Sequence, residues 1–119
     1  MGAPDLSFSV SHAGRRALVA LLRGGGRVGV DLEVHRPGRN FTAIAAACFP
    51  PDTARRLFGR LESPEFLADF YDEWTRYEAA TKVAGGSILY PEGIPRGPGL
   101  EFRTLPVWPG HSAALCLRY

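Results

Sequence analysis

The chain has 119 residues, of which 45% are hydrophobic and 22% charged, with a formal net charge of +2 and a sequence pI near 8.8. This size suits one hydrophobic core, so we expect a single domain over residues 1–119, and the mild positive charge falls short of the basic surface that nucleic-acid-binding proteins carry. The sequence shows neither a signal-peptide pattern nor an apolar run of membrane-spanning length, which predicts a cytoplasmic protein without membrane contact.

Three strands are predicted at the start of the chain. The stretch LSFSVSH alternates, with Leu6, Phe8 and Val10 on one face and three serines on the other, as in a strand that buries one apolar face. An Ala-Gly turn leads into RALVALLR, and three consecutive glycines lead into RVGVDLEVH. We therefore expect three antiparallel strands joined by two tight turns.

Two short helices are predicted next. Asn40 is a candidate N-cap for a helix in FTAIAAACF, which must end at the Pro50–Pro51 pair because proline disrupts a helix interior. Asp52 or Thr53 is expected to cap a second helix through RRLFGRL.

The most regular helical pattern begins at Pro64. Apolar and aromatic residues recur at three- and four-residue steps through FLADFYDEWTRY, which predicts a long amphipathic helix that ends near Ala84, before a Gly-Gly pair. Residues 90–99 contain three prolines and three glycines and predict a loop, whereas LEFRTL and SAALCLRY predict two closing strands. The fold class is therefore α+β, with a small antiparallel sheet packed against the long helix and shorter helices. Cys48 and Cys116 lie in apolar segments and are predicted to be buried thiols.

Two carboxylates interrupt the third predicted strand. Residues two apart in a strand share a face, so Asp31 and Glu33 lie side by side, roughly 6–7 Å apart along the backbone, while Val30 and Leu32 take the opposite face. Such a pair is able to share one divalent cation such as Mg²⁺, which binds carboxylates and leaves positions for water and phosphate oxygens. The other interpretation is a solvated polar face on an edge strand.

A second polar set lies on the long predicted helix. Trp74, Glu78 and Lys82 recur at four-residue steps in WTRYEAATK and so share one stripe of the helix. Glu78 and Lys82 have the spacing of an ordinary surface ion pair. Because Trp74 belongs to the apolar stripe, however, Glu78 is expected at the boundary of the core, where a carboxylate needs a partner or a function.

The first predicted strand ends in a basic corner. His12 lies at the end of the strand, and Arg15 and Arg16 lie in the turn after it, a combination suited to a phosphate group. A lone histidine at a strand end is also commonly structural or merely exposed. His35 and His111 show no metal-ligand spacing with the cysteines and are predicted to be surface residues.

Taken in order, FSVSHAG, VGVDLEVHRP, CFPPDTARRL and WTRYEAATK followed by two glycines resemble the carboxy-terminal half of 4′-phosphopantetheinyl transferases of the surfactin-synthetase-activating type. The likeness runs nearly end to end, since the final HSAALCLRY is similar to that family's last strand. It implies the 4′-phosphopantetheinyl transferase-like fold and an activity of the holo-acyl-carrier-protein synthase type. Such enzymes move the phosphopantetheine arm of coenzyme A onto a serine of an acyl or peptidyl carrier protein, release 3′,5′-ADP and require Mg²⁺.

The resemblance also implies roles for individual residues. Asp31, Glu33 and Glu78 would bind Mg²⁺ together with the pyrophosphate of coenzyme A, so that charge is neutralised as the phosphoanhydride breaks. Glu78 would also help to deprotonate the carrier serine, and Lys82 would contact the phosphate undergoing transfer.

Four residues near the first turn would bind coenzyme A according to the same resemblance. Ser11 and His12 match the pair that holds its 3′-phosphate in the family. Arg15 and Arg16, which are close by in the sequence, would assist them.

Departures from the family leave more than one functional interpretation open. Tyr77 stands where the family carries a lysine before the presumed catalytic Glu78, and Asp52 is the nearest acid in a segment that carries a glutamate in the family. The chain also corresponds to one of two similar halves whose active site lies between them. We therefore expect a homo-oligomer, a dimer or a trimer like the short holo-acyl-carrier-protein synthases. The first alternative to an active transferase is a catalytically degenerate domain that binds a carrier protein or another partner, and the second is a small globular domain of unrelated function.

Overall fold

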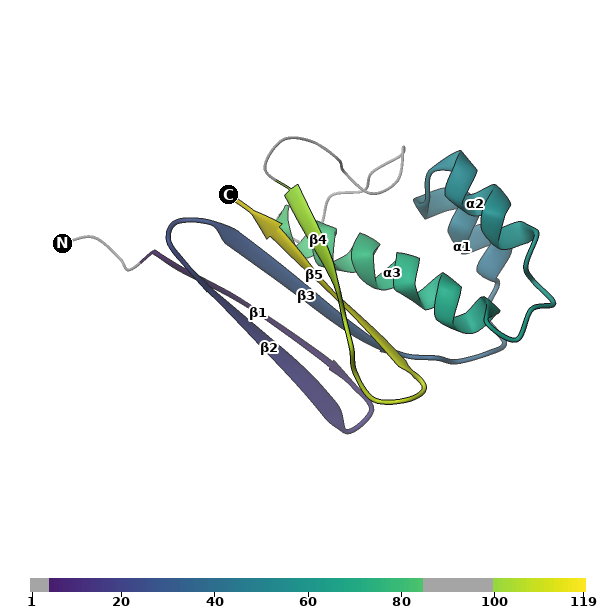
Figure 1. The fold of residues 1–119 in the computed structure, drawn as a ribbon, viewed down its shortest axis with the longest axis horizontal. Coiled ribbons are helices and arrows are strands. Elements are labelled where there is room, and N and C mark those ends of the chain that lie inside the picture. Colours follow the sequence, from purple (N-terminus) through teal and green to yellow (C-terminus); the bar gives the residue numbers. More distant parts are fainter. Residues whose placement is uncertain (1–4, 85–99) are drawn as a thin grey trace.

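The structure is a computed structural model that describes residues 5–84 and 100–119. Three strands, three helices and two further strands follow one another in these ranges, in the order that the sequence predicts, and the α+β fold class is confirmed (Figure 1). In chain order the elements are β1 (Leu6–Ala13), β2 (Arg16–Arg23), β3 (Arg27–Val34), α1 (Phe41–Cys48), α2 (Pro51–Phe58), α3 (Phe66–Val83), β4 (Leu100–Leu105) and β5 (His111–Arg118).

β1 and β2 form a two-stranded antiparallel hairpin. The pairing runs along the whole length of both strands, from Leu6 opposite Arg23 to Ala13 opposite Arg16. Gly14 at the tip has a φ of +60°, a left-handed conformation that glycine adopts without a steric penalty. The predicted Ala-Gly turn is therefore confirmed.

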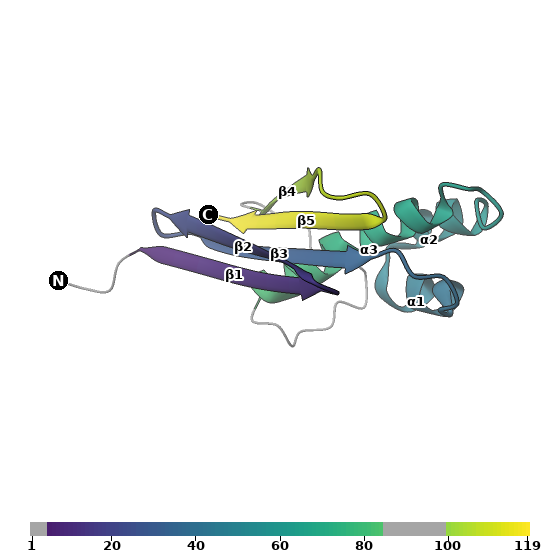
Figure 2. The same cartoon turned by 90° about the horizontal axis from the view of Figure 1, so that it is seen from below.

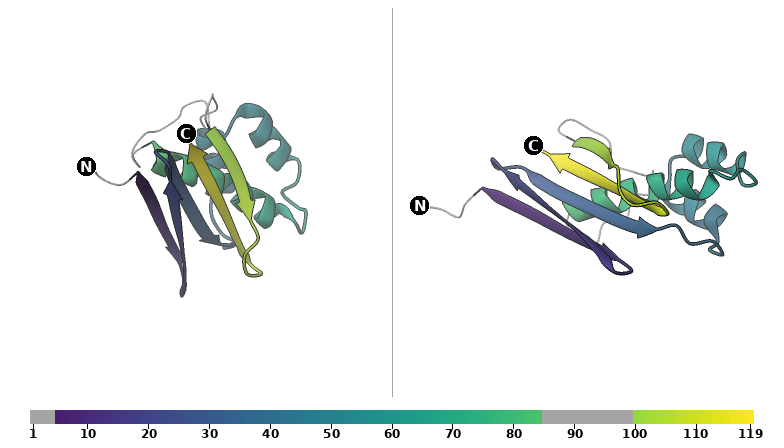
Figure 3. Two further views of the ribbon diagram at one scale, coloured as in Figure 1. Left: turned by 60° about the vertical axis from the view of Figure 1, so that its left-hand side comes forward. Right: turned by 60° about the horizontal axis from the view of Figure 1, so that its bottom comes forward.

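β3 does not continue this hairpin. It pairs antiparallel with β5, which also pairs with β4, so the second sheet has the strand order β3–β5–β4. The prediction of three antiparallel strands in succession is therefore wrong for the third strand, whose partner comes from the other end of the chain. Figure 3 shows the hairpin beyond β3, on the side away from β4. Turn signals mark where strands begin and end, but they do not determine which strands pair.

Serine side chains join the hairpin to the free edge of β3. Alternate backbone N–H groups of β3 point away from β5, and β1 offers them hydroxyl oxygens instead of backbone carbonyls. β1 therefore lies alongside β3 (Figure 2), and the hydrogen bonds place its serine face toward β3. The three bonds run from Val28 N to Ser7 Oγ (3.1 Å), from Val30 N to Ser9 Oγ (3.0 Å) and from Leu32 N to Ser11 Oγ (3.0 Å).

The faces of β1 are the reverse of the sequence prediction. Ser9 and Ser11 are buried, whereas Phe8 is 67% exposed and Leu6 and Val10 are each 48% exposed. The prediction assigned the apolar face to the core because apolar burial is the usual driving force. On this strand the hydroxyls face inward because the edge of β3 has N–H groups that need acceptors.

α3 packs along one face of the β3–β5–β4 sheet (Figures 1 and 3). Gly29 permits the close approach, because a Cβ atom at this position would lie 2.2 Å from the carbonyl oxygen of Ala79. The helix begins at Phe66, two residues after Pro64, and ends at Val83. Its apolar side builds the core, together with residues of α1, α2 and β5. The core includes Ala45, Phe49, Leu57, Phe66, Phe70, Tyr71, Tyr77, Ala79, Ala80, Val83 and Cys116.

α1 and α2 pack against each other, and α2 also contacts α3. Asn40 caps α1 as predicted, because its side-chain oxygen accepts a hydrogen bond from the N–H of Ala43. α2 begins at Pro51 without a side-chain cap, so the predicted caps Asp52 and Thr53 are wrong. Proline suits the first helical position because it lacks the N–H group that would otherwise need an acceptor.

Both cysteines are free thiols. Cys116 is buried as predicted, and burial raises the pKa of its thiol to about 11, whereas Cys48 is half-buried at the edge of the core. The predicted loop at residues 90–99 and the Gly-Gly helix end lie outside the described residues. Within the described ranges, no helix has the length and apolar character needed to span a membrane.

Candidate active site

One face of β3 and one stripe of α3 meet in a polar cluster. Asp31 and Glu33 come from β3, and Glu78 and Lys82 come from the helix packed on it. Asp31 is only 5% exposed, so the interpretation of a solvated edge-strand face is wrong for this residue. The structure therefore brings together the four residues singled out on these two elements. We call Asp31, Glu33 and Glu78 the carboxylate cluster.

The Ser11 hydroxyl and the Lys82 ammonium both contact the same carboxylate oxygen of Asp31. The Ser11 hydroxyl donates to Oδ1 at 3.2 Å, and Nζ of Lys82 lies 3.5 Å from the same atom. The other oxygen, Oδ2, is buried and has no hydrogen-bond partner within the described ranges. Burial, and next the Glu33 carboxylate, raise the pKa of Asp31 to about 8, while the Lys82 ammonium opposes the shift. A bound cation would stabilise the charged form of this carboxyl.

Lys82 is engaged inside the protein. Besides its contact with Asp31, its ammonium donates hydrogen bonds to the backbone oxygens of Val30 at 2.7 Å and Val10 at 3.3 Å. These contacts link α3 to β3 and to the hairpin. They also account for the three N–H donors of the ammonium. The surface-pair interpretation paired Lys82 with Glu78, but the structure pairs Lys82 with Asp31.

Glu78 is half-buried at the core boundary, as its position in the helical stripe predicts. Burial raises the pKa of its carboxyl, and the Glu33 carboxylate raises it further. Lys82, the Thr81 hydroxyl and Arg39 act in the opposite direction. A carboxylate whose pKa is raised from its usual value is a stronger base and is better matched to proton transfer near neutral pH.

The chemistry of the carboxylate cluster suits a hard divalent cation. Mg²⁺ prefers carboxylate oxygens, and the unpartnered Oδ2 of Asp31 together with the mutual repulsion of the three acids favours a positive ion. With the side chains as they stand, no three His, Cys, Asp or Glu residues of segments 5–84 and 100–119 are grouped closely enough to hold a metal. Metal binding would therefore require side-chain movement, and Glu33 and Glu78 are only half-buried.

The four residues predicted to bind coenzyme A lie around the end of the hairpin but do not converge on one point. Ser11 is buried, with its hydroxyl between Leu32 N and Asp31, whereas His12 and Arg15 are exposed. The guanidinium of Arg16 lies over the Trp108 ring, 4.3 Å from its centroid. His12 and Arg15 are thus open to a ligand, and the other two side chains are engaged within the protein.

A second polar network was missed from the sequence. His35 Nε2 lies 2.7 Å from Ser112 Oγ, and the Ser112 hydroxyl donates to Oδ1 of Asp72 at 3.1 Å. The His35 ring also stacks on Tyr71 at 5.5 Å, and burial lowers its pKa. His35 is half-buried, so the prediction of a surface residue holds only in part. Strand periodicity predicts that His35 shares the face of Glu33, but it could not identify Ser112 as the partner, because that residue is far away in the chain.

An aromatic stack stands beside the carboxylate cluster. Trp74 stacks on Tyr77 with 5.6 Å between ring centroids and on Phe70 with 6.4 Å, and Tyr77 is buried in the core. Tyr77, which replaces a lysine of the resembling family, is thus a core side chain. The guanidinium of Arg39 lies over the Trp74 ring, 5.5 Å from its centroid, and nothing in the sequence pattern singled it out.

Comparison with known proteins supports one family. No family model matches the chain. Over 87 residues it is 42% identical to the 4′-phosphopantetheinyl transferase AcpT of Salmonella typhimurium (strain LT2), which covers 72% of this chain and 43% of the relative. It is 36% identical to AcpT of Escherichia coli (strain K12), in a match that covers 71% of this chain and 44% of that relative. It is also 33% identical to the putative 4′-phosphopantetheinyl transferase slr0495 of Synechocystis sp. (strain PCC 6803), in a match that covers 68% of this chain and 32% of that relative.

The architecture is an α+β domain with its acidic side chains gathered between one strand and one long helix. By sequence the chain belongs to the 4′-phosphopantetheinyl transferase superfamily. It spans less than half the length of the curated relatives it matches.

Proposed function

We propose that the chain takes part in Mg²⁺-dependent transfer of the 4′-phosphopantetheine arm from coenzyme A to a serine of an acyl or peptidyl carrier protein, with release of 3′,5′-ADP. The observation that carries the proposal is the meeting of Asp31, Glu33, Glu78 and Lys82 in a chain whose relatives bear the transferase name. The activity would be of the holo-acyl-carrier-protein synthase type.

The carboxylate cluster would hold the metal ion. Bound there, Mg²⁺ would offset negative charge on the pyrophosphate of coenzyme A. The unpartnered Oδ2 of Asp31 supports this assignment, because a buried carboxylate without a donor is stabilised by a cation. Ser11 would keep Asp31 oriented through the hydrogen bond to Oδ1.

Glu78 would serve as the general base. The serine oxygen of the carrier protein forms a bond to the phosphorus that bears the pantetheine, and the bridging P–O bond breaks so that 3′,5′-ADP leaves. The serine proton passes to the carboxylate of Glu78, directly or through one water. The raised pKa of Glu78 supports this role because a more basic carboxylate accepts the proton more readily.

The remaining side chains would bind the nucleotide. Lys82 would contact the transferred phosphate from its place beside Asp31, at the expense of one hydrogen bond to a backbone carbonyl. His12 and Arg15 are exposed and would receive the 3′-phosphate. Ser11 and Arg16 would take part only by exchanging their present partners, Asp31 and Trp108.

The alternative function is a carrier-binding or partner-binding module without catalysis. Two observations favour it: the internal engagement of the Lys82 ammonium, and the core position of Tyr77, which leaves no lysine directly before Glu78. A module of this kind would keep the fold and the exposed surfaces while lacking transfer.

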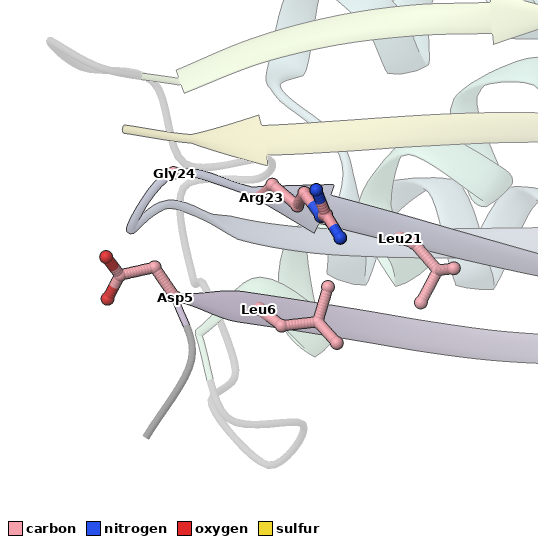
Figure 4. A pocket seen from close by; sticks show the side chains of 5 residues that line it. All are labelled: Asp5, Leu6, Leu21, Arg23 and Gly24. Carbon is pink, nitrogen blue, oxygen red and sulfur yellow. The ribbon is translucent and has the colours of Figure 1, made fainter. Parts of the chain in front are cut away.

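We also propose that a second copy of the chain covers the outer face of the hairpin. This face is apolar yet exposed, which is unusual for a surface that stays in contact with water. A hollow of about 630 Å³ extends the face at the open end of the hairpin (Figure 4). A second copy would take the place of the additional residues that the longer relatives have outside the matched region. The exposed apolar residues are Leu6 (48%), Phe8 (67%), Val10 (48%), Val19 (64%) and Leu21 (68%).

Transfer is tested directly by incubating the protein with coenzyme A, Mg²⁺ and several apo-carrier proteins, and by reading the carrier mass. We expect carriers to gain the phosphopantetheine mass, Asp31→Ala and Glu78→Gln to abolish the gain, and Glu62→Gln, which removes an exposed carboxylate, to leave it unchanged. Circular dichroism checks that each variant is folded. Absence of transfer to every carrier, with coenzyme A binding unaffected by Asp31→Ala, would establish the non-catalytic module.

A further inference from the structure

Two cations act on the carboxylate cluster, and only one of them is free to meet a ligand. Lys82 and Arg39 both lower the pKa of Glu78 by proximity. The Lys82 ammonium is occupied by two backbone carbonyls and Asp31. The backbone oxygen of Arg39 accepts a hydrogen bond from Phe41 N–H. The Arg39 guanidinium forms no hydrogen bond and no ion pair with residues 5–84 or 100–119, and it lies over the Trp74 ring. Its five N–H donors therefore remain available.

The position of Arg39 is defined by that aromatic contact. Its guanidinium lies over the Trp74 ring, and Trp74 precedes Glu78 by one turn on the same stripe of α3. The ring is itself fixed between Phe70 and Tyr77, with interplanar angles of 12° and 19°. Because a cation–π contact uses none of the guanidinium's N–H donors as hydrogen bonds, a guanidinium held over a ring can still bind an anion through two of them.

We propose that Arg39 binds the pyrophosphate of coenzyme A at the edge of the carboxylate cluster. The inference rests on the proposed function, because that function supplies the pyrophosphate as the ligand. Even with Lys82 and one divalent cation in place, three carboxylates and a pyrophosphate carry an excess of negative charge. Arg39 reduces this excess, and its planar fork matches two phosphate oxygens.

Arg39 also explains how the site tolerates Tyr77. The lysine that the resembling family carries before Glu78 would place a cation on α3, but the Tyr77 side chain is buried. Arg39 brings a cation to the same part of α3 from the connection between β3 and α1. It is thus a substrate-binding residue that neither the motif order nor the helical stripe reveals.

The test is calorimetric titration of coenzyme A, with Mg²⁺ present, into the full chain and its variants. We expect Arg39→Ala to weaken binding about 10- to 100-fold, the range for losing a hydrogen bond to a charged group. Arg39→Lys should recover part of the loss because it restores the charge without the planar fork. Arg55→Ala removes an exposed arginine of α2 that pairs with Asp52, and it should bind like the unmodified chain.

Dephospho-coenzyme A identifies which phosphate is bound, since it keeps the pyrophosphate but lacks the 3′-phosphate. If Arg39→Ala weakens the affinity for both ligands by the same factor, the pyrophosphate assignment is supported. A loss of affinity confined to coenzyme A overturns it. Thermal unfolding separates a structural role: unchanged affinity in Arg39→Ala, with or without a lower Tm, overturns the inference while the proposed function stands. If the unmodified chain binds neither ligand with Mg²⁺, the proposed function fails and the inference fails with it.

Discussion

The ammonium of Lys82 lies 3.5 Å from Oδ1 of Asp31 while it donates a hydrogen bond to the backbone oxygen of Val30, 2.7 Å away. Through a further bond to Val10 at 3.3 Å, the same group reaches the hairpin. One side chain of α3 therefore holds three parts of the fold together at the point where the carboxylate cluster lies. A change at Lys82 acts on the fold and on the site at once.

Lys82→Met is expected to lower the free energy of unfolding by about 1–3 kcal/mol. The variant keeps the apolar stem but removes the donors of two backbone carbonyls and the cation beside Asp31, and buried polar groups left without partners cause losses of this size. Urea unfolding measures the loss. Arg76→Met is the matched control, because it removes a cation of α3 that donates an exposed hydrogen bond to the Thr104 hydroxyl. This control should lose less of the free energy of unfolding. Equal losses in the two variants would contradict the linking role of Lys82.

The stability of the protein without Mg²⁺ is expected to fall as the pH rises from about 4 to about 8. The pKa of Asp31 is about 8 in the folded state against 3.8 as its ordinary value, so between these values the folded chain holds a proton that the unfolded chain has released. The stabilisation is fully present below the unfolded pKa and is lost as the pH approaches the folded pKa. Each unit removes at most about 1.4 kcal/mol for this one proton.

Urea unfolding at several pH values measures this dependence. Asp31→Asn mimics the protonated carboxyl and should flatten the slope, whereas Asp52→Asn, at an exposed position of α2, should leave it intact. Under the proposed function, Mg²⁺ should restore stability at pH 8 in the unmodified chain and not in Asp31→Asn, because a ligand that binds only the folded state stabilises it. A slope of the opposite sign in the unmodified chain would show that Asp31 is charged throughout.

Much of the local structure was predictable from short-range signals. The helical stripe placed Glu78 at the core boundary, Asn40 capped α1, and the alternation rule put Asp31 and Glu33 on one face. These successes share a cause, since periodicity and capping depend on residues a few positions apart. The resemblance to a family then joined segments that no local rule could join.

The failures concern relationships between distant segments. The faces of β1 were inverted because hydrogen bonding by Ser9 and Ser11 to the edge of β3 depends on a strand pairing that the sequence does not display. Arg39 and His35 were missed for the same reason: their partners, Trp74 and Ser112, are far away in the chain. Patterns within one element locate a residue on a face, but only the tertiary fold says what that face meets.

Ser9→Ala is expected to loosen the contact between the hairpin and β3. The hydroxyl of Ser9 is the recorded acceptor for the buried N–H of Val30, and its loss should lower the free energy of unfolding by about 1–3 kcal/mol. Hydrogen exchange at the Val30 amide should accelerate in Ser9→Ala. Ser9→Thr retains a hydroxyl on a residue type that strands accept, so its exchange should stay slow. Fast exchange at Val30 in the unmodified chain would contradict the serine contact.

Charging the outer face of the hairpin is expected to separate the proposed subunits. Light scattering should give a dimer or a trimer for the unmodified chain and a monomer for Phe8→Glu and Val19→Glu, because both side chains are apolar and more than 60% exposed. Leu61→Glu changes an exposed leucine outside this face and should leave the assembly intact. A monomeric unmodified chain, or an assembly indifferent to both hairpin substitutions, would rule out a second copy on this face.

Gly29→Ala is expected to separate β3 from α3. The new Cβ atom would lie 2.2 Å from the carbonyl oxygen of Ala79, a backbone atom that cannot rotate away, so the helix must shift. Overpacking of this kind lowers stability by about 1–3 kcal/mol and occasionally by more. Gly59→Ala is the matched control, because its Cβ atom would meet its neighbours at 3.6 Å or more and its φ of −73° suits alanine. That control should change stability by less than about 1 kcal/mol.

The same variant tests whether the close approach of β3 and α3 serves the site. A shift of α3 moves Glu78 and Lys82 away from Asp31, so Mg²⁺ should no longer stabilise Gly29→Ala at pH 8 even where the variant remains folded. Urea unfolding with and without Mg²⁺ measures both effects in one series. If Gly29→Ala loses stability but keeps the full response to Mg²⁺, the ion binds without Glu78, and the metal site then consists of the two carboxylates of β3 alone.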